Sequence, residues 1–244
     1  MNRKDRLMIL LILIIIFTIT LCSVYYLTPT KPLHETSSFS SLNIGNSSYG
    51  TVIKEGPYGN RESDIKVAII VGVHPMESDA QKAMMDALKQ NYNSLKYSYT
   101  VYRINVTQYP DDYEKGRMNG QLLANKFAVP DIINQKYNLA VDVHSNVGNW
   151  DKTRFVFAPV AGSSSETLGQ NLSNELEWIS YYDPPNPTST VYVTEPLIAA
   201  GVPALVYETF HNDTQKEKLD HANELLQAVD DLKINNCLWE NIEV

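Results

Sequence analysis

Residues 67–77, with the sequence VAIIVGVHPME, constrain the fold of this chain more than any other stretch. The first five are apolar and mostly β-branched, which is typical of a strand buried on both faces of a parallel sheet. Gly72 ends the run, and His74 and Glu77 follow at His-x-x-Glu spacing. Residues 78–90 then carry apolar side chains at helical spacing. An imidazole and a carboxylate are therefore expected at the carboxyl end of a buried strand, where open α/β sheets bind ligands.

Two later stretches repeat this arrangement. Residues 141–145 (VDVHS) and residues 205–209 (LVYET) each place one titratable group, His144 or Glu208, at the end of an apolar, β-rich run. Three such strand ends, in the order His-x-x-Glu, His, Glu, form a candidate site.

Two histidines and a glutamate are a ligand set of catalytic zinc sites, which keep a fourth position open for water. The sequence therefore predicts Zn²⁺ bound by His74, Glu77 and His144. Glu208 could take a proton from water and pass it to the leaving nitrogen as general base and acid. Asp142, two residues before His144, either orients that ligand or bonds to backbone N–H groups.

The rest of the chain alternates between strand and helix patterns, which predicts an α/β sandwich with a mainly parallel sheet. Residues 109–120 are expected to be a polar loop that contains Arg117, and residues 61–244 a single domain. Further strands are expected at residues 97–106, 139–144, 154–158 and 204–210, and further helices at residues 121–135, 165–179, 195–200 and 214–234.

The N-terminus predicts a membrane anchor. Residues 1–6 include three basic side chains, and residues 7–27 contain no charge and are long enough to cross a bilayer. Basic residues on this flank keep the tail cytoplasmic, so the catalytic domain is expected outside the cell, attached by a single-pass signal anchor. A cleaved signal peptide is the alternative. Residues 28–60 are expected to form a polar stalk.

Composition excludes one class of partner and leaves others open. The chain has 20 Lys+Arg against 28 Asp+Glu and no basic stripe, which argues against a nucleic-acid partner. Cys22 falls in the expected span and Cys237 is alone in the rest, so no internal disulfide is expected. His211 and His221 are expected at the surface.

The motifs GVHPME at residues 72–77, DVHS at residues 142–145 and AGVPALVYE at residues 200–208 resemble the zinc carboxypeptidase superfamily, including its succinylglutamate desuccinylase and aspartoacylase branch. The resemblance implies zinc on His74, Glu77 and His144, with Glu208 as general acid and base. It also implies a three-layer α/β/α fold around a mixed eight-stranded sheet.

One departure from the family concerns the substrate carboxylate. The family usually carries an Asn-Arg pair before the second histidine, and the nearest match here is Asn125-Lys126. Asn125 and Lys126 are therefore candidate substrate-binding residues, although lysine cannot make the planar two-pronged grip of arginine. Arg117 could take that role, with Arg154 as a weaker candidate, although either could be a surface side chain. Tyr192 is a candidate for capping the pocket.

These observations favour an anchored, outward-facing zinc-dependent hydrolase of peptide or amide bonds, similar to carboxypeptidases. An N-acyl amino-acid deacylase is one alternative, and a catalytically silent protein that binds envelope peptides is another. The presence of all four polar positions favours an enzyme, because a silent binder has no need of Glu208.

Overall fold

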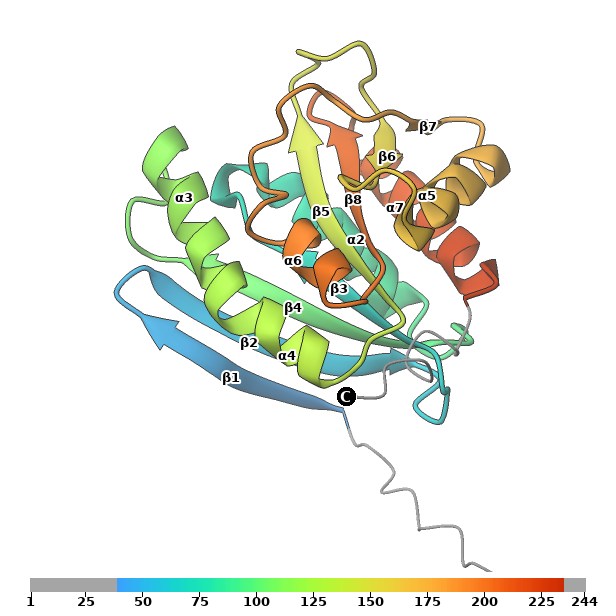
Figure 1. Ribbon diagram of the computed structural model, residues 1–244, viewed down its shortest axis with the longest axis horizontal. Coiled ribbons are helices and arrows are strands. Elements are labelled where there is room, and N and C mark those ends of the chain that lie inside the picture. The colour runs from blue at the N-terminus through green and yellow to red at the C-terminus, as the bar shows by residue number, and fades with distance from the viewer. Residues whose placement is uncertain (1–38, 235–244) are drawn as a thin grey trace, which may run out of the picture. The chain divides into compact units, whose positions relative to one another are not determined.

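The computed structural model describes residues 39–234 of the 244-residue chain. Eight strands form one sheet in the order β1-β2-β4-β3-β5-β8-β6-β7 (Figure 1). The pairs β3–β4, β3–β5, β5–β8 and β6–β7 are parallel and the other three are antiparallel. The predicted α/β fold with a mixed, mostly parallel sheet is therefore confirmed. The strands are β1 Ser40–Ser47, β2 Gly50–Gly59, β3 Lys66–Val71, β4 Ser98–Val106, β5 Leu139–Asn146, β6 Phe155–Phe157, β7 Ser180–Tyr181 and β8 Ala204–Phe210.

Helices cover both faces of the sheet and complete three layers (Figure 1). One face packs against α2 Ser78–Gln90, α5 Ser164–Glu175 and α7 Gln215–Asp231. The other packs against α3 Tyr113–Leu123, the π-helical turn η2 Ala124–Ala128, α4 Val129–Asn134 and α6 Thr194–Ala199. Because β3 lies in the middle, its side chains alternate between two cores, which explains its continuous apolar run.

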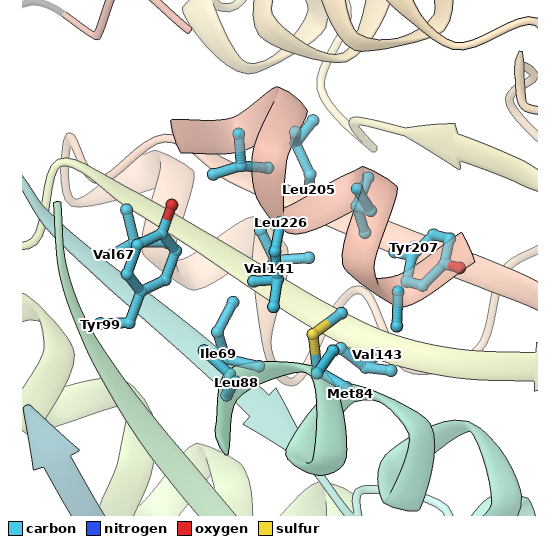
Figure 2. Packing of buried hydrophobic residues seen from close by; sticks show 14 of the residues in the cluster. Val67, Ile69, Met84, Leu88, Tyr99, Val141, Val143, Leu205, Tyr207 and Leu226 are labelled. Atoms are coloured by element: carbon cyan, nitrogen blue, oxygen red, sulfur yellow. The ribbon is translucent and has the colours of Figure 1, made fainter. Parts of the chain in front are cut away.

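The larger core lies between the sheet and α2, α5 and α7. Figure 2 shows Met84 and Leu88 of α2 and Leu226 of α7 around Val141 of β5, and all four side chains are buried. This core fixes α2, and with it the turn that precedes α2 in the chain.

The sheet begins earlier than expected. Residues 40–59 lie in the range 28–60 that was expected to be a polar stalk, yet they form β1 and β2. β1 is polar because it is an edge strand whose side chains are largely exposed. The Gly56-Pro57 dipeptide, a sequence common in turns, lies inside β2. The register against β4 shifts there, between Glu55 and Tyr58, and proline is tolerated at such an irregularity.

The expected polar loop at residues 109–120 is wrong over most of its length, because α3 begins at Tyr113. The Asp112 side chain caps this helix by accepting a hydrogen bond from the Lys115 backbone N–H. Arg117 therefore lies on a helix rather than in a loop. Helix α7 begins with a capping box between Thr214 and Glu217.

Among the helices of residues 39–234, none has the length and apolar character to cross a bilayer. The tail expected at residues 1–6, the anchor at residues 7–27 and both cysteines lie outside the described residues.

The core predicts a large stability difference between two leucine substitutions. Leu226 is buried and Leu42, on β1, is 59% exposed. We expect Leu226→Ala to lower the free energy of unfolding by about 2–5 kcal/mol, because it leaves a cavity in the core. Leu42→Ala should change it by no more than about 0.5 kcal/mol. Urea unfolding of both variants measures the difference, and equal losses would contradict the packing described here.

Candidate metal centre and active site

The turn after β3 brings His74 and Glu77 together. Gly72 has a φ of +91°, and a Cβ at this position would lie 2.1 Å from the carbonyl oxygen of Ile104, so only glycine can end the strand in this way. His74 is then the N-cap residue of a 3₁₀ turn, η1 Pro75–Glu77. Its Nδ1 atom lies 2.9 Å from Oε1 of Glu77.

β5 adds the second histidine. Nδ1 of His144 lies 2.9 Å from Oε2 of Glu77, and the two imidazole rings are 4.3 Å apart between centroids. Each of the three side chains offers one ligand atom, and these atoms all lie within 4.8 Å of one another. Two imidazole nitrogens and a carboxylate in this arrangement are typical of a zinc site. The structure therefore brings the three predicted ligands together.

Burial and neighbouring charges set the protonation of this cluster. Burial lowers the pKa of His74 to about 4, so its ring is neutral at physiological pH, as a metal ligand must be. Burial also disfavours the charged form of His144, but Asp142 and Glu77 outweigh it and raise the pKa of His144. Burial opposes ionisation of Glu77, but His144 and His74 outweigh it and lower the pKa of Glu77. A metal ion that binds here competes with protons for His144.

The outer ring nitrogens of both histidines face polar side chains. Nε2 of His74 lies 3.2 Å from Nε2 of Gln121; a flip of the amide places the Gln121 oxygen there as the acceptor of the ring N–H. Nε2 of His144 lies 2.9 Å from Oδ2 of Asp142, although the two atoms are poorly aligned for a hydrogen bond. Both Asp142 oxygens are buried without a hydrogen bond from any described residue, which favours the ligand-orienting interpretation of Asp142.

Arg117 contacts the centre through Glu77. Its Nη1 donates to Oε1 of Glu77 at 2.9 Å, and the Ser145 backbone N–H donates to Oε2 at 3.1 Å. The guanidinium also donates to the Thr188 hydroxyl at 3.3 Å and lies 4.9 Å from the centre of the Tyr113 ring. These contacts hold a fixed positive charge beside the predicted ligands.

Two glycines allow α3 to come this close. A Cβ at Gly120 would lie 2.0 Å from the carbonyl oxygen of Val73, and a Cβ at Gly116 would lie 2.8 Å from that of Tyr109. Arg117 and Gln121 each follow one of these glycines. The Gly-x-x-x-Gly spacing therefore lets the helix backbone contact the turn that carries His74, and places both polar side chains at the site.

Glu208 comes from β8, where it is the register partner of His144 on β5. Its carboxylate accepts a hydrogen bond of 3.4 Å from the Asn146 amide. Burial raises the pKa of Glu208 to about 8, against the charge of His144 and together with that of Glu77. A cation bound at the cluster would act as the charge of His144 does and would lower this pKa.

The centre opens into a cleft of about 780 Å³. His74, Glu77, Arg117, Tyr192 and Glu208 all line it. Two of the three predicted ligands, the predicted general base and two of the four predicted substrate-binding residues therefore share one cavity, and His144 is buried behind its lining.

The other two predicted substrate-binding residues do not line the cleft. Asn125 and Lys126 lie on η2 and are exposed. The Asn125 amide donates to the backbone oxygen of Tyr192 at 2.8 Å, so it supports the segment that carries this residue. The Lys126 ammonium lies 5.2 Å from the ring centre of Phe127, which packs over Gly45 of β1. The expectation that the Asn125-Lys126 pair grips a substrate is therefore not supported by its position.

Three further side chains have clear locations. Arg154 forms a two-pronged ion pair with Asp213 and does not line the cleft. His221 stacks on Trp178 with 4.1 Å between ring centroids. His211 is exposed as expected, but it also lines the cleft.

Sequence reasoning missed Gln121 and Asn146. Gln121 lies four residues after Arg117, a spacing that places both on one side of a helix, but the sequence predicts a loop for the residues between them. Asn146 lies two residues after His144 and so shares its face of β5. Either could have been found by extending the strand and helix patterns.

No protein-family model matches the sequence, and no curated protein matches it either. Solved structures do. A candidate carboxypeptidase from Burkholderia mallei is similar with a TM-score of 0.55 and 15% identity, over 80% of this chain and 63% of that one. A metallo-carboxypeptidase from Pseudomonas aeruginosa, in complex with (2-guanidinoethylmercapto)succinic acid, matches with a TM-score of 0.52 and 13% identity over 80% and 63%.

An aspartoacylase family protein from Mesorhizobium loti matches with a TM-score of 0.50 and 13% identity, over 78% of this chain and 67% of that one. The chain thus spans less than two thirds of the Burkholderia and Pseudomonas proteins. The described residues have a zinc carboxypeptidase-like fold, and a His-Glu-His cluster lies at the carboxyl ends of its central strands.

The cluster predicts about one bound zinc ion per chain. We expect His144→Ala to lose the metal on dialysis, because one of the three ligands is gone. His221→Ala is the matched control, since His221 lies outside the cluster, and it should keep a full equivalent. Elemental analysis of the dialysed proteins measures the zinc content per chain. Full retention in His144→Ala would remove this residue from the ligand set.

Gln121 should tune the affinity of the site without being a ligand. Removing the acceptor of the His74 N–H in Gln121→Leu should weaken zinc binding about 10- to 100-fold. Gln121→Glu keeps an acceptor and should bind more tightly than Gln121→Leu. Gln170→Leu, an exposed substitution on α5, is the control. Competition with a chelating dye measures the affinities, and unchanged affinity in Gln121→Leu would show that the contact does not orient His74.

Proposed function

We propose that this chain is a zinc-dependent hydrolase of peptide or amide bonds, of the carboxypeptidase-like kind. The observation that carries the proposal is the convergence of His74, Glu77 and His144 at an open cleft, which His74, Glu77 and Glu208 line. His74 and His144 would hold the ion through Nδ1, and Glu77 through its carboxylate. Zinc, when bound, supplies Lewis-acid chemistry that polarises the substrate carbonyl and makes water a better nucleophile.

Glu208 is the proton carrier in this proposal. It is buried and lies beside His144, within the cleft, so it can take a proton from the attacking water and give it to the leaving nitrogen. The Asn146 amide holds one of its oxygens and leaves the other free to face substrate.

Arg117 is the fixed positive charge. Held between Glu77, Thr188 and the Tyr113 ring, it can stabilise negative charge on the substrate, either on the carbonyl oxygen as it is attacked or on a carboxylate.

A second candidate is an N-acyl amino-acid deacylase. The likeness to an aspartoacylase family protein supports it, because the same fold is found there. The two candidate functions use the same predicted metal centre and differ in the substrate that the rest of the cleft would bind.

The proposal also includes a location at the cell membrane. Residues 7–27 carry no charge and follow Arg3, Lys4 and Arg6. This pattern supports a single-pass anchor with the catalytic domain outside the cell.

Glu208→Gln tests the enzyme proposal. The variant keeps its size and hydrogen bonds but cannot carry a proton, so turnover of a peptide mixture should fall by about two to four orders of magnitude. Zinc content should be unchanged, because Glu208 is not a ligand. Glu177→Gln, an exposed position outside the cleft, is the matched control and should keep full activity.

Mass spectrometry of the peptide products and elemental analysis read out the two properties. Loss of zinc in Glu208→Gln would make Glu208 a ligand, and undiminished hydrolysis would make it structural. A wild-type protein that holds zinc and cleaves nothing would instead be the silent peptide binder.

A further inference from the structure

The mouth of the cleft carries an unusual set of apolar side chains. Ten large apolar residues are exposed in the described part of the chain, and four of them line this one cleft. We call these four the apolar collar: Met76, Tyr113, Met118 and Val147, with exposed fractions of 54%, 60%, 42% and 69%. Exposed apolar side chains that gather at one cavity mark a binding surface, whereas isolated ones do not.

The collar comes from three separate segments, and each contributes it beside a polar residue of the site. Met76 precedes Glu77 on η1, Met118 follows Arg117 on α3, and Val147 follows Asn146 at the end of β5. A peptide that reaches the predicted metal centre would therefore contact apolar side chains from three segments of the protein.

Buried apolar side chains also line the cleft. Phe157 and Val206 line the floor and are buried register partners on β6 and β8. Val206 lies two residues before Glu208, on the same face of its strand. Trp150 lines the wall and packs edge-on against Phe155. A large apolar side chain next to the scissile bond could thus contact apolar side chains both at the exposed collar and at these deeper positions.

The charged residues that line the cleft also disfavour acidic side chains on a substrate. Among the described residues that line it, Arg117 is the only Lys or Arg. Its guanidinium is already bonded to Glu77 and Thr188, and in the proposed function its charge acts on the carbonyl oxygen or the terminal carboxylate of the substrate. Glu114, which also lines the cleft, would repel a substrate side chain that carries a carboxylate. No second Lys or Arg of the described lining offsets that repulsion.

We propose that the substrates are peptides whose residues beside the scissile amide are large and apolar and carry no acidic side chain. This inference rests on the proposed function. Of the two candidate functions, it favours the peptidase over a deacylase that acts on small acyl amino acids with two carboxylates. The flexible side chains of Met76 and Met118 suit a surface that accepts different apolar residues.

The test separates binding from catalysis by using full-length Glu208→Gln protein loaded with zinc. Two fluorescently labelled, N-acetylated octapeptides are the probes. One ends in leucine and phenylalanine with a free C-terminus, and the other has aspartate at those positions. Anisotropy should show that the apolar peptide binds at least about tenfold more tightly, as expected for several buried apolar contacts.

Collar substitutions then locate the contact. Adding Met118→Ser and Val147→Ser should weaken binding of the apolar peptide by about three- to tenfold. The matched control adds Leu42→Ser and Val160→Ser, two exposed apolar positions that do not line the cleft, and should leave binding within twofold of the parent, the scatter usual for distant surface changes.

Equal binding of the two peptides, tighter binding of the acidic one, or no effect of the collar substitutions would each overturn the inference. The proposed function is judged separately. If the apolar peptide is selected through the collar but the zinc-loaded wild type does not cleave it, the ligand class holds and the hydrolase proposal fails. If the wild type cleaves both peptides equally, the hydrolase proposal holds and the apolar specificity fails.

Discussion

The carboxylate of Glu77 is the interaction on which the site depends. It is largely buried, and a buried charge is tolerated only when it is paired and hydrogen-bonded. Oε1 contacts His74 and Arg117, while Oε2 contacts His144 and the Ser145 backbone N–H. The turn after β3, helix α3 and strand β5 therefore meet at one carboxylate. Without Glu77, two imidazoles and a guanidinium would face one another with no negative charge between them.

The parts of this fold that a sequence reveals are those in which burial dictates composition. β8 and α2 have the ends predicted from their apolar patterns, and β3 and β5 differ only at their margins. The site follows from the same signal, because parallel strands that are buried on both faces end at one edge, and a polar residue there is conspicuous. His74, His144 and Glu208 could be identified for this reason, and Glu77 by its spacing from His74.

The parts that could not be predicted lack that contrast. β1 is an edge strand and carries polar side chains on its exposed positions, so it has the composition of a stalk. α3 contains Gly116 and Gly120, which are poor helix formers, and their reason for being there is a close approach to backbone atoms far away in the chain. Lys126 was matched to a motif by its neighbours in sequence. Only the packing of Phe127 over Gly45 shows that this part of the chain faces the sheet edge and not the cleft.

The π-helical turn η2 affects how the site is connected to the edge of the sheet. α3, η2 and α4 form one uninterrupted helical run, in which buried residues recur every four positions, at 116, 120, 124, 128 and 132. An α-helix has 3.6 residues per turn, so residues spaced by four gradually move around the helix axis. The π-helical turn contains more residues per turn and compensates for this displacement. One face of the run can therefore follow the sheet from the metal cluster to β1. Through the contact of Gly45 with Phe127, β1 packs on the same helical run that carries Arg117 and Gln121. One continuous helical segment therefore joins the edge strand β1 to the predicted metal ligands, across half the width of the sheet.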